Sequence, residues 1–171
     1  MSNQFLPGYQ LRLSSTWERA TLLKFLKLSY QELFPEQKNF SHLKETARKY
    51  FSSETPLWWV ELADVAVSEG SMSLPVSHPV ACLWLGNSVD QVIGDRHAYI
   101  LLLYVMPEYR RQGIGSALMR HAEEWAICRG DRQIALQVFQ SNQPALSLYH
   151  QMSYQTQSLW MVKPLRPNSL E

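Results

Sequence analysis

Apolar residues recur along this chain with two different spacings, and the spacing separates predicted strands from predicted helices. Period-two alternation, or a short run of β-branched and aromatic residues, predicts strands at residues 9–14, 57–67, 80–85, 97–105, 133–139 and 154–162, the last range holding one strand or two. The apolar run from Tyr99 to Val105 is nearly continuous, which is typical of a strand buried on both faces in the middle of a sheet.

Apolar residues at helical spacing predict four helices: from Ser15–Glu18 to the residue before Pro35, over about 42–52, from Gly113 to Arg129, and from Asn142 to Met152. Ser15 followed by Glu18 reads as a capping box at the first helix start. Asn142 can cap the fourth helix, and Pro144 suits its first turn, where an N–H has no intrahelical partner.

The order of these elements is β, α, α, β, β, β, α, β, α, β, which predicts an α/β fold with a mixed central β-sheet. Three successive strands predict antiparallel pairing, and the β-α-β crossover after residue 105 predicts a parallel pair, with helices on both faces. All 171 residues are expected to form this single domain, since a chain of that length can bury a core unaided. Residues 164–171 are expected to be a frayed tail.

The composition argues against nucleic acid, membranes and metal ions as partners. A net charge of +1 gives no basis for binding nucleic acid. Apolar runs are too short to span a bilayer and the N-terminus lacks a signal-peptide apolar region, so we expect a cytoplasmic protein without a membrane partner. Cys82 and Cys128 form no metal or redox motif, and we expect both to be reduced and buried. No metal is expected, because the histidines are scattered and His121-x-Glu123 lacks the cysteine pair of a deaminase zinc site.

The stretch Val105–Arg120, VMPEYRRQGIGSALMR, carries the clearest chemical signal. It joins the fourth predicted strand to the third predicted helix. A helix N-terminus has four N–H groups without intrahelical partners and a partial positive charge. Gly113 and Gly115 let an anion approach that backbone closely, and Arg110 and Arg111 precede them. The pattern favours a phosphate or pyrophosphate ligand.

Two common nucleotide-binding motifs do not fit this stretch. A Rossmann fingerprint needs a glycine where Leu118 stands, and no P-loop motif is present. The pattern Arg110-x-x-Gly113-x-Gly115, after a strand ending in Val-x-Pro-x-x-Arg, instead resembles the acyl-CoA pyrophosphate loop of the GNAT superfamily of N-acyltransferases.

A second motif downstream strengthens the resemblance. The family pattern Asn-x-x-Ala-x-x-Leu-Tyr-x-x-x-Gly-Phe is matched at four positions, Asn142, Ala145, Leu148 and Tyr149. Ser153 stands for the glycine and Tyr154 for the phenylalanine, which are mild departures. The element order is also that of the GNAT fold, whereas close motif matching covers only Tyr99 to Tyr154.

The resemblance implies that acetyl-CoA is a co-substrate, bound by Leu103, Val105, Arg110, Arg111, Gln112, Gly113, Gly115, Ser116 and Asn142. Backbone N–H groups of the glycine loop would hold the pyrophosphate, with the two arginines near the phosphates. A bulged fourth strand, around Leu103–Val105, would pair with the pantetheine arm and the thioester carbonyl. Tyr149 would give a proton to the leaving thiolate, a role that suits a phenol of high pKa.

The implied activity is transfer of an acetyl group to a primary amine by direct attack. The acceptor remains open among small amines, amino acids and protein or peptide amines. Many small-amine members carry a carboxylate in the middle of the fourth strand, where this chain has Leu101 and Leu102. The amine proton would then pass to water or to one of the peripheral candidates Glu61, Asp95, His97 and Glu108. The missing carboxylate leaves room for a second hypothesis, a regulatory module that senses acyl-CoA without turnover, and a homodimer also stays open.

Overall fold

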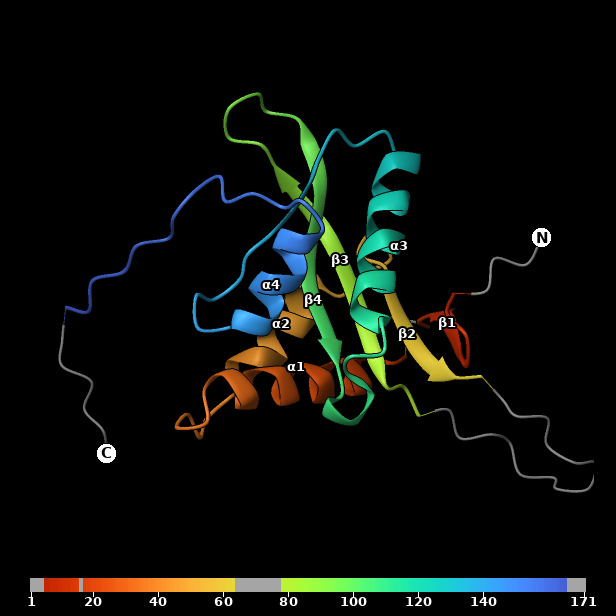
Figure 1. Ribbon diagram of the computed structural model, residues 1–171. Coiled ribbons are helices and arrows are strands. Elements are labelled where there is room, and N and C mark those ends of the chain that lie inside the picture. Colours follow the sequence, from red (N-terminus) through yellow and green to blue (C-terminus); the bar gives the residue numbers. More distant parts are fainter. Residues whose placement is uncertain (1–4, 16, 64–77, 166–171) are drawn as a thin grey trace, which may run out of the picture.

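The computed structural model describes residues 5–15, 17–63 and 78–165 (Figure 1). Its elements are β1 (Tyr9–Leu13), α1 (Arg19–Leu33), α2 (His42–Tyr50), β2 (Leu57–Leu62), β3 (Ala81–Val89), β4 (Arg96–Val105), the 3-10 turn η1 (Pro107–Tyr109), α3 (Ile114–Cys128), β5 (Ile134–Leu136) and α4 (Gln143–Gln151). Most of the connection between the strands predicted at 57–67 and 80–85, and most of the predicted tail, lie outside the described residues.

The strands form one sheet in the order β1-β2-β3-β4-β5. Neighbours from β1 to β4 are antiparallel, and β5 runs parallel to β4 after the α3 crossover. Each face has its own apolar core, and different helices cover the two faces (Figure 1). The predicted mixed α/β sheet with helices on both faces is therefore confirmed.

The α3 and α4 face is packed with aliphatic side chains, whose most buried members include Val60, Leu83, Leu85, Leu118 and Met119. The α1 and α2 face is more aromatic, and its most buried members include Leu22, Phe25, Trp59 and Trp84. Phe25 meets Trp59 edge to face, with ring centroids 5.1 Å apart. These aromatic contacts fix α1 against the strands, which determines where its C-terminal end lies.

Glu18 ties the start of α1 to the sheet. The helix begins at Arg19, and the Ser15 N–H donates to the Glu18 carboxylate at 2.8 Å, which is one half of the predicted capping box. Arg12 on β1 forms ion pairs of 2.8 Å with both Glu18 and Glu61. The hydrogen bonds from Arg12 lower the pKa of Glu18 to about 2.

Several predicted strand boundaries differ from the structure. The strand predicted over 57–67 ends at Leu62, and residues 64–67 lie outside the described residues. β3 continues to Val89, where a connection was predicted from residue 86, and β5 keeps only the middle of 133–139. The strand predicted over 154–162 is wrong, since Tyr154–Val162 forms no strand and Leu159 to Val162 are 72–88% exposed. Apolar, β-favouring composition produces a strand only beside a partner strand. No described strand lies beyond β5 to provide one.

Three further expectations concern thiols, metals and membranes. Cys82 is buried, and burial raises the pKa of its thiol. Cys128 is exposed, contrary to expectation, because it lies on the outer side of the last turn of α3. Across the described ranges no group of three or more His, Cys, Asp or Glu side chains could hold a metal ion. None of the helices described has the length and apolarity of a membrane span.

Candidate active site

The sheet opens between β4 and β5. The two strands pair only from Ala98 opposite Ile134 to Ile100 opposite Leu136. At the next residue the β3–β4 register shifts, so that Leu101 is an extra residue in β4. A bulge bends a strand and increases its twist. Beyond Leu101, β4 pairs only with β3, and its other edge carries no strand of the described chain.

The resemblance implied a bulge around Leu103–Val105, but in the structure the bulge lies at Leu101. It also changes which face the neighbouring side chains occupy. Leu101 and Leu102 both pack on the α1 and α2 side, whereas Leu103 packs on the α3 and α4 side. Nothing marks this position in an unbroken run of leucines, so the sequence alone could not locate it.

The open edge of β4 presents backbone groups of Leu103 and Val105. In an antiparallel pair, successive residues point their N–H and C=O groups alternately toward and away from the partner strand. The Met106 N–H donates to the Val80 carbonyl at 2.9 Å, so Tyr104 and Leu102 also face β3. Leu103 and Val105 consequently face the gap. The backbone groups of the two predicted strand residues thus point away from β3, and among them the Val105 carbonyl accepts a hydrogen bond from Arg110.

The glycine loop leads from the end of β4 into α3 in an anion-binding conformation. Arg111 has φ 64° and Gly113 has φ 84°, so two left-handed residues flank Gln112. A chain that alternates in this way turns successive N–H groups toward one point and forms a concavity that suits an anion. Gly113 is the N-cap of α3, whose first N–H groups add to the same site. A methyl group added at Gly113 would meet only Leu6, at 4.0 Å, so its backbone angle rather than space requires glycine here.

A hydrogen bond from the N-terminal segment holds the glycine loop, and the sequence did not indicate this contact. The Tyr9 hydroxyl donates to the Gln112 side-chain oxygen at 2.5 Å. Tyr9 is 9% exposed, and its N–H donates to the Leu6 carbonyl at 2.9 Å. Tyr9 and Gln112 are 103 residues apart, so no local sequence pattern could have indicated this contact.

The two predicted arginines differ in their surroundings. The Arg110 guanidinium donates to the Val105 carbonyl at 2.9 Å and to the Glu32 carboxylate at 2.6 Å, and it lies 5.6 Å from the Tyr104 ring centroid. Its charge is therefore largely balanced by Glu32, which also accepts a hydrogen bond from Tyr104. Arg111 is exposed and forms no ion pair with any residue that the structure describes.

Leu148, in the second half of α4, packs against the start of α3. A methyl added at Gly115 would lie 3.3 Å from Leu148, so this glycine permits close helix packing. Asn142 caps α4, its side-chain oxygen accepting from the Ala145 N–H at 3.3 Å, as the sequence predicted. Ser116 is half-buried in the first turn of α3. The glycine loop and the start of α3 therefore lie at the C-terminal end of β4, with Leu148 of α4 packed beside Gly115.

Tyr149 is buried on the α3 and α4 side of the open edge. It belongs to the apolar cluster that also packs against Leu103, Val105 and Val138. Its burial raises the pKa of the phenol to about 12. The ring of Tyr154 lies 5.9 Å away, and burial together with the nearby Glu123 carboxylate raises the pKa of the Tyr154 phenol. Tyr149 is therefore a neutral phenol at physiological pH.

A series of aromatic rings connects the C-terminal end of α1 with the segment after β5 and with the start of α2. Phe34, at the C-terminal end of α1, meets Phe139 from the segment after β5 edge to face, with centroids 4.9 Å apart. Tyr30 lies 6.0 Å from Phe34 and 5.9 Å from His42 at the start of α2. The contact between Phe34 and Phe139 joins the two layers that flank the gap between the diverging strands. Sequence reasoning did not single out these rings.

None of the four peripheral base candidates lies on the bulged part of β4. Glu61 is on β2 and pairs with Arg12, and Asp95 forms an ion pair with Arg132 at 3.5 Å. His97 is near the opposite end of β4 from the glycine loop, with its ring nitrogen 3.3 Å from the Gln133 side chain. Glu108 is an exposed residue of the turn after β4.

Comparison with known proteins identifies relatives of this chain by sequence and by fold. The model of the acetyltransferase (GNAT) family matches residues 22–154. Thialysine N-epsilon-acetyltransferase of Mus musculus is 31% identical over 134 residues, which are 75% of this chain and 69% of that protein. Its Bos taurus counterpart is 30% identical over 112 residues, 66% of this chain and 64% of that protein. The chain thus spans about two thirds of these relatives. A solved structure, a putative acetyl transferase from Pyrococcus furiosus, superposes with a TM-score of 0.66 at 25% identity, covering 92% of this chain and 99% of the other.

Proposed function

This chain belongs to the acetyltransferase (GNAT) family, and from this premise we propose that it transfers the acetyl group of acetyl-CoA to a primary amine by direct attack. The observation that carries the proposal is an open strand edge that ends in an anion-binding turn. The open strand edge offers hydrogen bonds to an extended chain of amides, and the turn offers hydrogen bonds to a pyrophosphate. Acetyl-CoA has both groups, at opposite ends of one flexible arm.

The residues present fit this ligand by position. We propose that the backbone N–H groups of Gln112, Gly113 and Gly115, together with Ser116, bind the pyrophosphate. Arg111 would supply most of the positive charge near the phosphates, because Arg110 is already paired with Glu32. The N–H and C=O of Leu103, and the N–H of Val105, would pair with the pantetheine arm. The Val105 carbonyl already accepts from Arg110, so it contributes less. Asn142 would contact the ligand from the N-terminus of α4, through polar groups that do not take part in capping the helix.

The reaction follows from the same groups. A β4 N–H would donate to the thioester carbonyl and stabilise the negative charge that grows on its oxygen as the amine nitrogen attacks. As the carbon–sulfur bond breaks, Tyr149 would give its proton to the sulfur, and no covalent bond to the protein forms. Because Leu101 and Leu102 occupy the middle of β4, we propose that the amine passes its proton to water or enters already neutral.

The printed names of the relatives suggest where to begin with the acceptor. The mouse and cattle proteins are named for acetylating thialysine. For this chain, an amino acid, a small amine or a peptide amine are all compatible with the proposal. The two leucines on β4 and the distant base candidates favour one second candidate, a module that binds acyl-CoA without turnover.

A single experiment tests the proposed activity. Acetyl-CoA is incubated with panels of small amines, amino acids and peptides, and release of free thiol is measured. Thiol release that depends on at least one amine is the expected result. Binding of acetyl-CoA without amine-dependent release would favour the second candidate, and failure to bind acetyl-CoA would overturn both.

Replacing Tyr9 by phenylalanine is expected to weaken acetyl-CoA binding while leaving the maximal rate unchanged. The substitution keeps the buried ring but removes the hydroxyl that holds Gln112 between the two left-handed residues. Loss of one hydrogen bond, about 1 kcal/mol, corresponds to a roughly fivefold higher dissociation constant. Calorimetric titration with acetyl-CoA measures it, and Tyr50→Phe on α2 is the control. Equal affinity in wild type and Tyr9→Phe would show that Tyr9 does not position the loop.

A further inference from the structure

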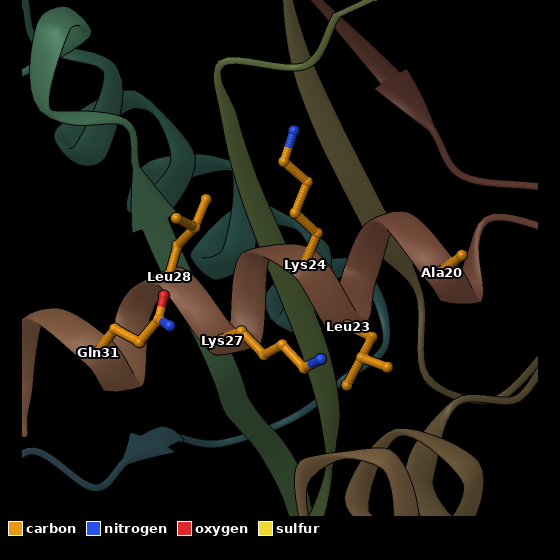
Figure 2. Close-up of a pocket in the computed structure, with 6 residues that line it drawn as sticks. All are labelled: Ala20, Leu23, Lys24, Lys27, Leu28 and Gln31. Carbon is orange, nitrogen blue, oxygen red and sulfur yellow. The ribbon is translucent and has the colours of Figure 1, made fainter. Parts of the chain in front are cut away.

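The outer side of α1 borders a groove that the proposed reaction does not use. One hollow of about 320 Å³ is lined by Ala20, Leu23, Lys24, Lys27, Leu28 and Gln31, and Figure 2 shows all six along successive turns of α1. A second hollow of about 450 Å³ continues from it toward α2, since both share Leu23, Lys27 and Gln31. From Ala20 to Gln31 the helix rises roughly 16 Å, the length of about five extended residues.

The groove combines an apolar floor with a basic rim. Leu23 is half-buried, and Phe40, from the connection between α1 and α2, is 8% exposed. Four exposed lysines surround this floor, Lys24, Lys27, Lys38 and Lys44. No aspartate or glutamate is among the described residues that line either hollow.

These lysines are not balanced locally. The ion pairs formed within the described ranges all use arginine as the cation, and none of the four lysines takes part in them. Glu45, the acidic residue on α2, pairs with Arg48 at 2.9 Å. The chain as a whole carries a net charge of only +1, so the residues outside the groove together carry −3 and the groove concentrates positive charge. A positive surface of this kind attracts a negatively charged partner and speeds its encounter.

We propose that the groove between α1 and α2 binds an acidic polypeptide segment, in which carboxylates meet the four lysines and apolar side chains rest on Leu23 and Phe40. The apolar floor favours a peptide over nucleic acid, because it gives a binding site to side chains that alternate with the charged ones. A nucleic acid would need a longer basic path that follows its phosphates. None of the described residues that line either hollow belongs to β4, so peptide binding can be measured without acetyl transfer.

The test measures peptide binding without acetyl-CoA. The probe is a fluorescein-labelled peptide of about ten residues that alternates glutamate and leucine, read by fluorescence anisotropy. Lys27→Glu/Lys44→Glu reverses two charges in the groove, and Lys49→Glu/Lys163→Glu makes the same change in net charge at exposed positions outside it. We expect the groove variant to raise the dissociation constant at least tenfold and the control variant to change it less than twofold. Added salt should weaken wild-type binding, since the contacts are exposed.

Three results would overturn the proposal. The first is no binding by the wild-type chain, and the second is an equal loss in both double variants. The third is equally effective competition by a single-stranded oligonucleotide of matching charge, which would show a general affinity for polyanions. Thermal melting of each variant confirms that it is folded, and Lys27→Ala/Lys44→Ala provides a milder change if the charge reversal impairs folding. Acetyl-CoA binding and turnover are not read, so a failed acetyl-transfer assay leaves this test intact.

Discussion

Acetyl-CoA is expected to stabilise the wild-type fold strongly and the Gly113→Val variant hardly at all. A ligand at about 100 times its dissociation constant adds about 2.7 kcal/mol to the free energy of unfolding, or roughly 5–10 °C in melting temperature for a chain of this size. Gly113 has φ 84°, a conformation that a β-branched residue adopts only with strain. Valine would therefore displace the turn, and the N–H groups of Gln112 and Gly113 would no longer point to one anion.

The chain offers a close control for this strain. Gly94, in the turn between β3 and β4, has φ 77°, and a methyl added there would meet no atom within 4 Å. Gly94→Val should thus carry a similar backbone penalty, of the order of 1–2 kcal/mol, at a position away from the loop. We expect both variants to melt earlier than wild type, and only Gly113→Val to lose the shift given by acetyl-CoA. An undiminished shift in Gly113→Val would remove the loop from the proposed site.

The loop could be predicted from sequence because its chemistry is local. Glycine at a helix start, a preceding strand and adjacent arginines all lie within a few residues, and each has a direct physical meaning. Asn142 as a helix cap was predictable for the same reason, and the structure confirms that cap. The order of strands and helices followed from hydrophobic spacing, which reports the face that each element buries.

The contacts that shape the loop could not be predicted, because their partners are remote in sequence. Arg110 resembles a phosphate ligand in the sequence, yet its guanidinium pairs with Glu32, 78 residues away. Tyr9 supports Gln112 from the first strand. Both contacts depend on how α1 and β1 pack against the rest of the fold, and the spacing of residues within one segment does not predict this packing.

The incorrect strand over 154–162 shows a second limit. Leu159, Trp160, Met161 and Val162 have the composition of a strand, but strand formation requires an edge with unpaired backbone groups alongside. Composition reports the preference of a segment and says nothing of a partner. The bulge at Leu101 is the converse case, in which pairing with β3 changes the geometry of a segment whose composition is uniform.

Replacing Tyr149 by phenylalanine is expected to lower the maximal rate on the order of 100-fold, the usual contribution of a general acid, while leaving acetyl-CoA affinity unchanged. The variant keeps the buried ring and removes only the proton that would go to the leaving sulfur. Tyr154→Phe is the matched control, because this ring lies 5.9 Å away and the variant removes a hydroxyl that interacts with Glu123 rather than the proposed proton donor. This control should leave the rate unchanged.

The pH dependence separates this role from a structural one. Burial disfavours the phenolate and raises the pKa of Tyr149 to about 12, so the proton stays in place at every lower pH. The ratio of wild-type to Tyr149→Phe rates should therefore be constant from about pH 7 to pH 10, although both rates rise as more of the amine becomes neutral. Turnover and acetyl-CoA affinity are measured across that range with an acceptor from the amine panel. Full activity in a folded Tyr149→Phe protein would assign the hydroxyl to packing alone, and a ratio that falls toward one between pH 8 and 9 would mean that the proton donor has a much lower pKa than buried Tyr149.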